Sequence, residues 1–97
     1  MIEKKKTSKG IRVTFSLPAE AARKSVSVVG DFNNWDPSVH PMRLYKNKGV
    51  WSRSIVLKPG TYQFRYWVDG EHWINDEQAD GYTPSPFFSE NCLLHVG

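Results

Sequence analysis

Two tryptophans stand in polar segments of this sequence, where a large apolar side chain needs an explanation. Trp35 lies in the run 31–37, among asparagine and aspartate residues, and Trp73 follows the pair Asp69-Gly70 next to His72. Exposed indoles usually mark a binding surface. A sugar suits them, because pyranose C–H groups pack on an indole face while amides and guanidinium groups bond the hydroxyls. The alternative is that both indoles fold back as lids on the ends of the domain.

The polar residues that could surround these two indoles are of the types that bond sugar hydroxyls. They are Asn33, Asn34, Arg65, Asn75 and Asn91. The other two tryptophans have simpler explanations. Trp51 begins an apolar alternation and is expected in the core, whereas Trp67 falls on the opposite side of its strand, beside Arg65. The sequence therefore predicts a sugar-binding surface centred on Trp35 and Trp73.

Catalytic chemistry has little support in the sequence. A glycosidase needs two facing carboxylates, but the aspartates fall mainly in turns and loops, where aspartate serves as a capping residue. No G-x-S-x-G nucleophile motif occurs. Cys92 and the three histidines lack zinc-site spacing, and in a strand Cys92 is expected to be a small buried residue. We therefore expect a non-catalytic protein without a metal or cofactor.

The elements that must position these residues are β-strands. Apolar residues alternate with polar ones between turn signals, which is typical of an all-β domain. The pattern predicts strands over 11–17, 25–30, 42–45, 50–57, 61–68, 71–75 and 91–96. Turns are expected at 47–49 and 59–60, and Asp69-Gly70 favours a two-residue hairpin. Seven or eight short strands predict an immunoglobulin-like sandwich of two antiparallel sheets.

Length and charge limit the remaining possibilities. The 97 residues suffice for one small domain, which we place at 11–97, after a flexible basic tail at 1–10 that contains three consecutive lysines. The net charge is +3, and without the tail the body is nearly neutral, which argues against a dedicated nucleic-acid binder. A single cysteine excludes an internal disulfide, and neither a signal peptide nor a membrane span is visible. These features favour a cytoplasmic location.

Several segments together resemble carbohydrate-binding module family 48. They are Val28-Val29-Gly30-Asp31-Phe32-Asn33-Asn34-Trp35, Gly49-Val50-Trp51, the run 57–66, Val68-Asp69-Gly70, Trp73, Asp76 and 91–94. This family includes the glycogen-binding domain of the AMP-activated protein kinase β subunit and the N-terminal (early set) domains of branching enzymes and isoamylases. The resemblance implies an early set sandwich that binds α-1,4-glucan, such as glycogen, starch or maltooligosaccharide.

The family's sugar-binding positions can be matched residue by residue. Trp35 and Trp73 match two tryptophans that sandwich the glucan, and Arg65 matches a basic residue that bonds sugar hydroxyls. The remaining matches precede or begin the last strand: Phe87, Ser89 and Asn91. Phe88 departs from the family pattern, in which a small residue is usual.

Two other functions stay open on the sequence alone. A protein-interaction module of the same fold, having lost sugar binding, would bind an enzyme or kinase in trans, with Trp67 in the contact patch. Single-stranded nucleic acid on aromatic platforms beside the basic tail is a further alternative, which strong salt dependence would reveal. The favoured partner is an α-glucan, with a glycogen-metabolising enzyme or kinase as a possible second partner and no membrane.

Overall fold

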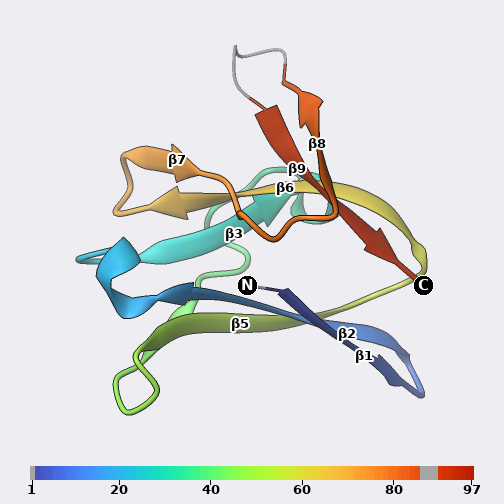
Figure 1. Ribbon diagram of the computed structural model, residues 1–97, viewed down its shortest axis with the longest axis horizontal. Helices are drawn as coiled ribbons and strands as arrows, with labels where there is room; N and C mark the ends of the chain where they lie inside the picture. Colours follow the sequence, from blue (N-terminus) through green and yellow to red (C-terminus); the bar gives the residue numbers. More distant parts are fainter. Residues whose placement is uncertain (1, 86–89) are drawn as a thin grey trace.

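The chain forms a sandwich of two antiparallel β-sheets in a computed structural model that describes residues 2–85 and 90–97 (Figure 1). Sheet A has the order β1-β2-β5-β4, with β1 (Ile2–Thr7), β2 (Gly10–Pro18), β4 (Arg43–Tyr45) and β5 (Val50–Leu57). Sheet B has the order β3-β6-β9-β8, with β3 (Val26–Gly30), β6 (Gly60–Val68), β8 (Gly81–Pro84) and β9 (Glu90–Val96), and β7 (His72–Ile74) also pairs with β6. Two 3₁₀ turns are η1 (Ala19–Ala21) and η2 (Asp31–Asn33). No described segment is a helix long and apolar enough to cross a membrane.

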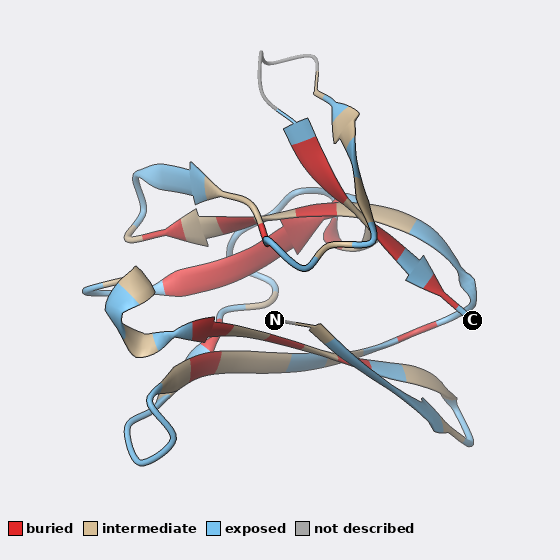
Figure 2. Cartoon of the chain, viewed as in Figure 1, coloured by how far each residue is buried: buried red, intermediate tan, exposed pale blue. Residues whose placement is uncertain are grey.

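The predicted all-β, immunoglobulin-like sandwich is confirmed, and its core lies between the sheets. The alternating residues Val13 and Phe15 of β2 and Phe64 and Tyr66 of β6 are fully inaccessible to solvent (Figure 2). The Phe15 and Phe64 rings meet edge to face, with centroids 5.2 Å apart. Burial of each such side chain contributes about 1.5–3 kcal/mol, so the two-residue alternation read from the sequence accounts for the packing of the sheets.

Residues 2–7 form strand β1, whereas the sequence analysis predicted a flexible tail. All six residues pair with β2, from Ile2 opposite Phe15 to Thr7 opposite Gly10. The sequence pattern did not reveal this strand, because the lysine run lacks the alternating apolar residues that predict one. Lysine is common on edge strands, where it discourages pairing with other chains. The basic segment is therefore the charged edge of sheet A.

Lys4 ties this edge strand to the other sheet. It lies opposite the buried Val13, so its side chain points to the inner side of sheet A. Its Nζ lies 2.6 Å from Oδ2 of Asp80, which precedes β8 in sheet B, and this oxygen also accepts a hydrogen bond from the His95 N–H. These bonds keep the pKa of Asp80 below its ordinary value, although burial acts in the opposite direction. Lys4 and Asp80 thus connect the two sheets at one edge.

A second strand that the sequence did not predict is β8, which ends in Pro84. Gly81 to Pro84 pair with β9, from Leu93 to Glu90. A proline is tolerated at the end of an edge strand because it need not donate to a neighbouring strand. With β1 and β8, the described residues form nine strands rather than seven or eight.

Deletion of residues 1–8 should lower the free energy of unfolding by about 2 kcal/mol, because Ile2 packs against the core and β2 would become an edge strand. Urea denaturation of the full and shortened chains measures the change. Lys4→Ala serves as the comparison, since it removes only the ion pair and should have a smaller effect. An unchanged unfolding midpoint in the shortened chain would contradict a structural role for β1.

Trp51→Ala should lower the free energy of unfolding by about 3–5 kcal/mol, as expected for deletion of a buried indole. Trp51 is 7% exposed, and its Nε1–H donates to the carbonyl of Ala19 at 3.2 Å. Thermal unfolding followed by circular dichroism tests this. A Trp51→Ala chain as stable as the wild type would show that this indole is not part of the core, as we conclude it is.

Candidate carbohydrate-binding site

The turn between β6 and β7 has the backbone expected of its residues. Asp69 and Gly70 have φ values of 55° and 68°, and the Glu71 N–H donates to the Val68 carbonyl at 3.1 Å. Positive φ at both central residues defines a type I′ turn, which Asp-Gly favours. The predicted turn at this dipeptide is therefore present.

The register after this turn differs from the prediction, and the difference decides where Trp73 lies. His72 lies opposite Val68 and Trp73 opposite Trp67, so the connection contains three residues rather than two. A two-residue connection would place Trp73 opposite Tyr66, on the buried side of the sheet. A shift of one residue exchanges the two faces of a strand. The extra residue thus places Trp73 on the outer face of sheet B.

Trp73 is an exposed indole held from two sides. Its ring centroid lies 4.5 Å from that of Trp67, with the planes tilted by 47°. The Arg65 guanidinium carbon lies 5.5 Å from the Trp73 ring centroid, a cation–π distance. Trp73 nevertheless remains 43% exposed. A fixed, partly exposed indole can stack on the apolar face of a sugar ring. The guanidinium group beside it can donate hydrogen bonds to the hydroxyls of the same ring.

Asn75 connects this indole to the neighbouring strand β9. Its Oδ1 accepts a hydrogen bond from Arg65 Nε at 3.1 Å, and its Nδ2 donates to the Glu90 carbonyl at 2.9 Å. An open hollow of about 420 Å³ lies here, lined by Asn75, Tyr82 and Glu90. Tyr82 is 44% exposed and adds an aromatic surface to the hollow. Arg65 and Asn75 are thus oriented by each other next to a concave part of the surface.

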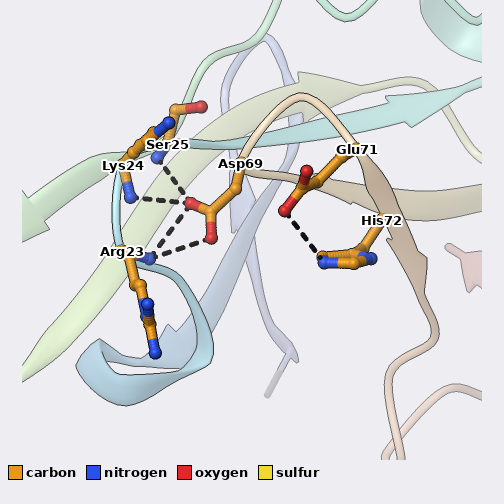
Figure 3. Close-up of polar contacts among 6 residues, drawn as sticks. All are labelled: Arg23, Lys24, Ser25, Asp69, Glu71 and His72. Carbon is orange, nitrogen blue, oxygen red and sulfur yellow. Dashed lines mark hydrogen bonds and ion pairs between the residues drawn. The ribbon is translucent and has the colours of Figure 1, made fainter.

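Asp69 anchors the turn end of the β6–β7 hairpin to the chain before β3. Its carboxylate accepts hydrogen bonds from the backbone N–H groups of Arg23, Lys24 and Ser25, the shortest 2.7 Å from Lys24 (Figure 3). These bonds, from Lys24 first and then Arg23, lower the pKa of Asp69. The hairpin is thus fixed at its tip by a carboxylate ionised at neutral pH.

Asp76 anchors the chain where it leaves β7. It is 3% exposed, and its carboxylate accepts bonds from the Tyr66 hydroxyl and the Gln78 N–H, both at 2.7 Å. Its own N–H donates to Sγ of the buried Cys92 at 3.2 Å. Burial, and then Asp76, raise the pKa of Tyr66, so the phenol stays protonated and can donate. Asp69 and Asp76 therefore hold the segment that carries Trp73 at both ends.

Trp35 is presented by a strained loop that follows β3. Asn34 and Trp35 have φ values of 57° and 58°, and the Trp35 N–H donates to the Gly30 carbonyl at 2.9 Å. Asparagine tolerates this left-handed conformation, but a bulky residue adopts it rarely, and such strain is concentrated at functional sites. The indole is 36% exposed, whereas Phe32 packs against the core. The loop thus buries one aromatic ring and exposes the next.

Asn33 holds this loop together from the inside. It is 7% exposed; its Oδ1 accepts from the Gly30 N–H at 3.0 Å, and its Nδ2 lies 3.1 Å from the Val28 carbonyl and 2.9 Å from His40 Nδ1. Burial, and then Arg53, lower the pKa of His40, which favours the neutral imidazole that can accept from this amide. With both N–H donors engaged, Asn33 supports the loop, and the neighbouring Asn34 is the one exposed to solvent.

The loop is also fixed to β6, on the same sheet as Trp73. The Gln63 N–H donates to Asp31 Oδ2 at 3.2 Å, and the Gln63 side chain accepts a bond from Asn91 Nδ2 at 3.1 Å. Gln63 and Arg65 share the outer face of β6, because Phe64 between them is buried. The structure thereby brings Arg65, Asn91 and Trp73 to one face of sheet B, with the base of the Trp35 loop beside them. Asn91 is 6% exposed, so like Asn33 it supports the surface from within.

Three residues of interest lie outside the described part of the chain: the predicted ligands Phe87 and Ser89, and Phe88. Sequence reasoning missed the support that Trp67 gives to Trp73, and it missed Gln63. The alternation along β6 places Gln63, Arg65 and Trp67 on one face, so that signal was available. Among the described residues, no three His, Cys, Asp or Glu side chains are grouped to hold a metal ion.

Comparison with known families identifies the chain. The family model described as "Glycogen recognition site of AMP-activated protein kinase" matches residues 11–83. The chain belongs to this family. The resemblance inferred from the glycine, tryptophan and turn motifs is thus confirmed.

The chain also resembles curated bacterial proteins named 1,4-alpha-glucan branching enzyme GlgB. It is 46% identical to that of Pseudomonas putida over 68 residues, which is 70% of this chain and 9% of the relative. It is 39% identical to that of Thiobacillus denitrificans over 71 residues, or 73% of this chain and 10% of the relative. The chain therefore spans about a tenth of the length of these relatives.

Asp69→Gly should loosen the β6–β7 hairpin, because glycine keeps the positive φ but removes the carboxylate anchor. We expect amide hydrogens of residues 66–74 to exchange about tenfold faster, with shifted indole N–H resonances of Trp67 and Trp73. Asp69→Asn, which keeps one acceptor oxygen, should change less. Folding lowers the pKa of Asp69, so the ionised carboxylate should stabilise the hairpin at neutral pH. The wild type should lose this stabilisation only as the pH falls below the ordinary pKa of 3.8. Equal exchange rates in all three chains would contradict the anchor.

Proposed function

We propose that this domain binds α-1,4-glucan without catalysis, through stacking on Trp73 and Trp35 and hydrogen bonds from Arg65 and Asn34. The observation that carries the proposal is the exposed Trp73 indole, supported by Trp67 and flanked by a guanidinium group that Asn75 orients. This arrangement offers a flat apolar surface next to donors of fixed direction, which suits a pyranose ring. Phe87 and Ser89 are proposed to complete the site from the segment before β9.

The family supports a glucan rather than another sugar. The chain belongs to a family described by glycogen recognition, and its relatives are named for an activity on 1,4-α-glucan. Because the chain matches about a tenth of those relatives, we infer a module that brings a partner enzyme to the polysaccharide. Such a partner would be a glycogen-metabolising enzyme or a kinase, in the same polypeptide or in trans.

The engaged carboxylates support a role without catalysis. Asp31, Asp69 and Asp76 accept backbone N–H bonds, each of which fixes a loop or turn. Asp36 caps the turn at Ser38, and Asp80 is paired with Lys4. Aspartates used in this way hold the backbone, whereas a glycosidase needs two carboxyl groups that face each other across the sugar.

Trp35→Ala and Trp73→Ala should each weaken binding of maltoheptaose about tenfold, because one stacking platform contributes roughly 1–2 kcal/mol. The wild-type Kd is expected between about 10 μM and 1 mM. Isothermal titration or tryptophan fluorescence measures both. Unfolding midpoints should change little, since neither indole is buried in the core.

Tyr45→Ala is the matched control, because Tyr45 is an equally exposed aromatic residue (39%) on sheet A. Its removal should leave maltoheptaose binding unchanged. A folded Trp35→Ala/Trp73→Ala double variant that binds maltoheptaose as tightly as the wild type would remove the proposed site and leave the family assignment intact.

A further inference from the structure

Sheet A and the rest of the chain carry opposite charges, which the overall charge of +3 conceals. The strands and hairpin turns of sheet A, residues 2–18 and 43–57, contain nine of the thirteen lysines and arginines and one of the ten acidic residues. The nine are Lys4, Lys5, Lys6, Lys9, Arg12, Arg43, Lys46, Lys48 and Arg53. The rest of the chain has four basic and nine acidic residues. Sheet A is therefore strongly basic and the remainder is acidic.

Most of the lysines and arginines of sheet A form no ion pair with the described residues of the domain. Across residues 2–85 and 90–97, only Lys4 of these nine forms an ion pair. Lys5 and Arg12 lie directly opposite each other on β1 and β2, on the outer face of the sheet. Like charges in opposed positions destabilise a sheet. An acidic ligand on the outer face would relieve this repulsion between Lys5 and Arg12.

Small hydroxyl side chains lie between the charged residues on the outer face of sheet A. Thr14 and Ser54 share a hydrogen bond of 2.8 Å across β2 and β5, and Ser52 lies opposite both Ser16 and Arg43. Val56, opposite Arg12, is 48% exposed. Because these hydroxyl side chains are small, another protein surface can approach this face closely and contact the surrounding cations and the exposed valine.

We propose that the outer face of sheet A docks an acidic protein surface, so that the domain binds glucan on sheet B and a protein partner on sheet A. Exposed Val56 and Arg12 suit a protein interface, in which arginine and apolar contacts are enriched. The acidic remainder of the domain would steer such a partner away from sheet B. This inference goes beyond the proposed glucan binding and does not depend on it.

A protein fits this face better than a nucleic acid does. Single strands bind on free aromatic platforms between cations. Here, among the described residues, the outer face offers a single exposed aromatic ring, Tyr45, rather than a row of platforms. The charged groups of Arg43 and Lys48 already lie 5.6 and 5.9 Å from its centroid.

Binding of poly-L-glutamate, a probe for an acidic polypeptide, tests the proposal with two variants of equal charge. Lys5→Gln/Arg12→Gln/Arg43→Gln removes three exposed cations from sheet A. Arg23→Gln/Lys24→Gln/Lys58→Gln removes three exposed cations outside it. We expect at least a tenfold loss of affinity at low salt for the first variant, and less than a twofold loss for the second. Maltoheptaose binding should be unchanged in both, so failure of the glucan site would be recognised separately.

Lys5→Glu separates docking from folding. It places opposite charges at the pair with Arg12, so the unfolding temperature should rise while affinity for poly-L-glutamate falls. Loss of binding in a more stable chain cannot result from unfolding. Unchanged affinity in this variant would overturn the assignment of the face.

Two further results would also overturn the proposal. Equal losses of poly-L-glutamate binding in the two triple variants would show that total charge, rather than sheet A, determines binding. Tighter binding of a single-stranded oligonucleotide, or of phosphatidylserine vesicles, than of poly-L-glutamate at the same salt concentration would mean that the face binds phosphate groups instead of an acidic protein.

Discussion

The register of the short strand β7 against β6 is the constraint on which the candidate site depends. Because Asp69, Gly70 and Glu71 all lie between the paired strands, Trp73 faces outward beside Trp67 rather than inward beside Tyr66. A strand of three residues has few hydrogen bonds with which to fix that register. The fixing bonds come from aspartates at its two ends, Asp69 at the turn and Asp76 after the strand. The polar anchors thus determine where an apolar binding surface lies.

A similar arrangement supports the second indole. Gly30 has no room for a side chain, since a Cβ there would lie 2.4 Å from the Gln63 carbonyl oxygen. That close approach lets β3 run into the η2 turn beside β6, where Asn33 and Asp31 fix the backbone. The left-handed conformation of Trp35 follows from these bonds. Both tryptophans are therefore held at the surface by neighbouring hydrogen-bonded polar groups, which is how a small domain can keep large apolar side chains in fixed positions there.

The sequence predicted the parts of this fold that depend on two-residue alternation and on turn chemistry. Strands β2, β5, β6 and β9, the buried Trp51 and the positive φ values at Asp69-Gly70 all follow from these local rules. Strand β1 could not be predicted in this way, because its lysines carry no apolar pattern and its pairing depends on β2. The register of β7 was wrong by one residue, since Asp-Gly favours a two-residue turn and only the anchors select three. The engagement of Asn33 likewise depends on His40, seven positions away, which no local pattern reveals.

The charge of the domain gives a further reason why composition alone misleads. A net charge of +3 over 97 residues describes a weakly basic protein, yet it is the sum of a basic sheet and an acidic remainder. A neutral glucan is indifferent to this field, so the acidic side would carry no penalty for the proposed stacking on Trp73. A charged partner is not indifferent, because the field of the whole domain orients it before contact. The sandwich can therefore keep the two proposed surfaces separate by their chemistry: the glucan site would select for ring faces and hydroxyls, and the docking face would select for negative charge.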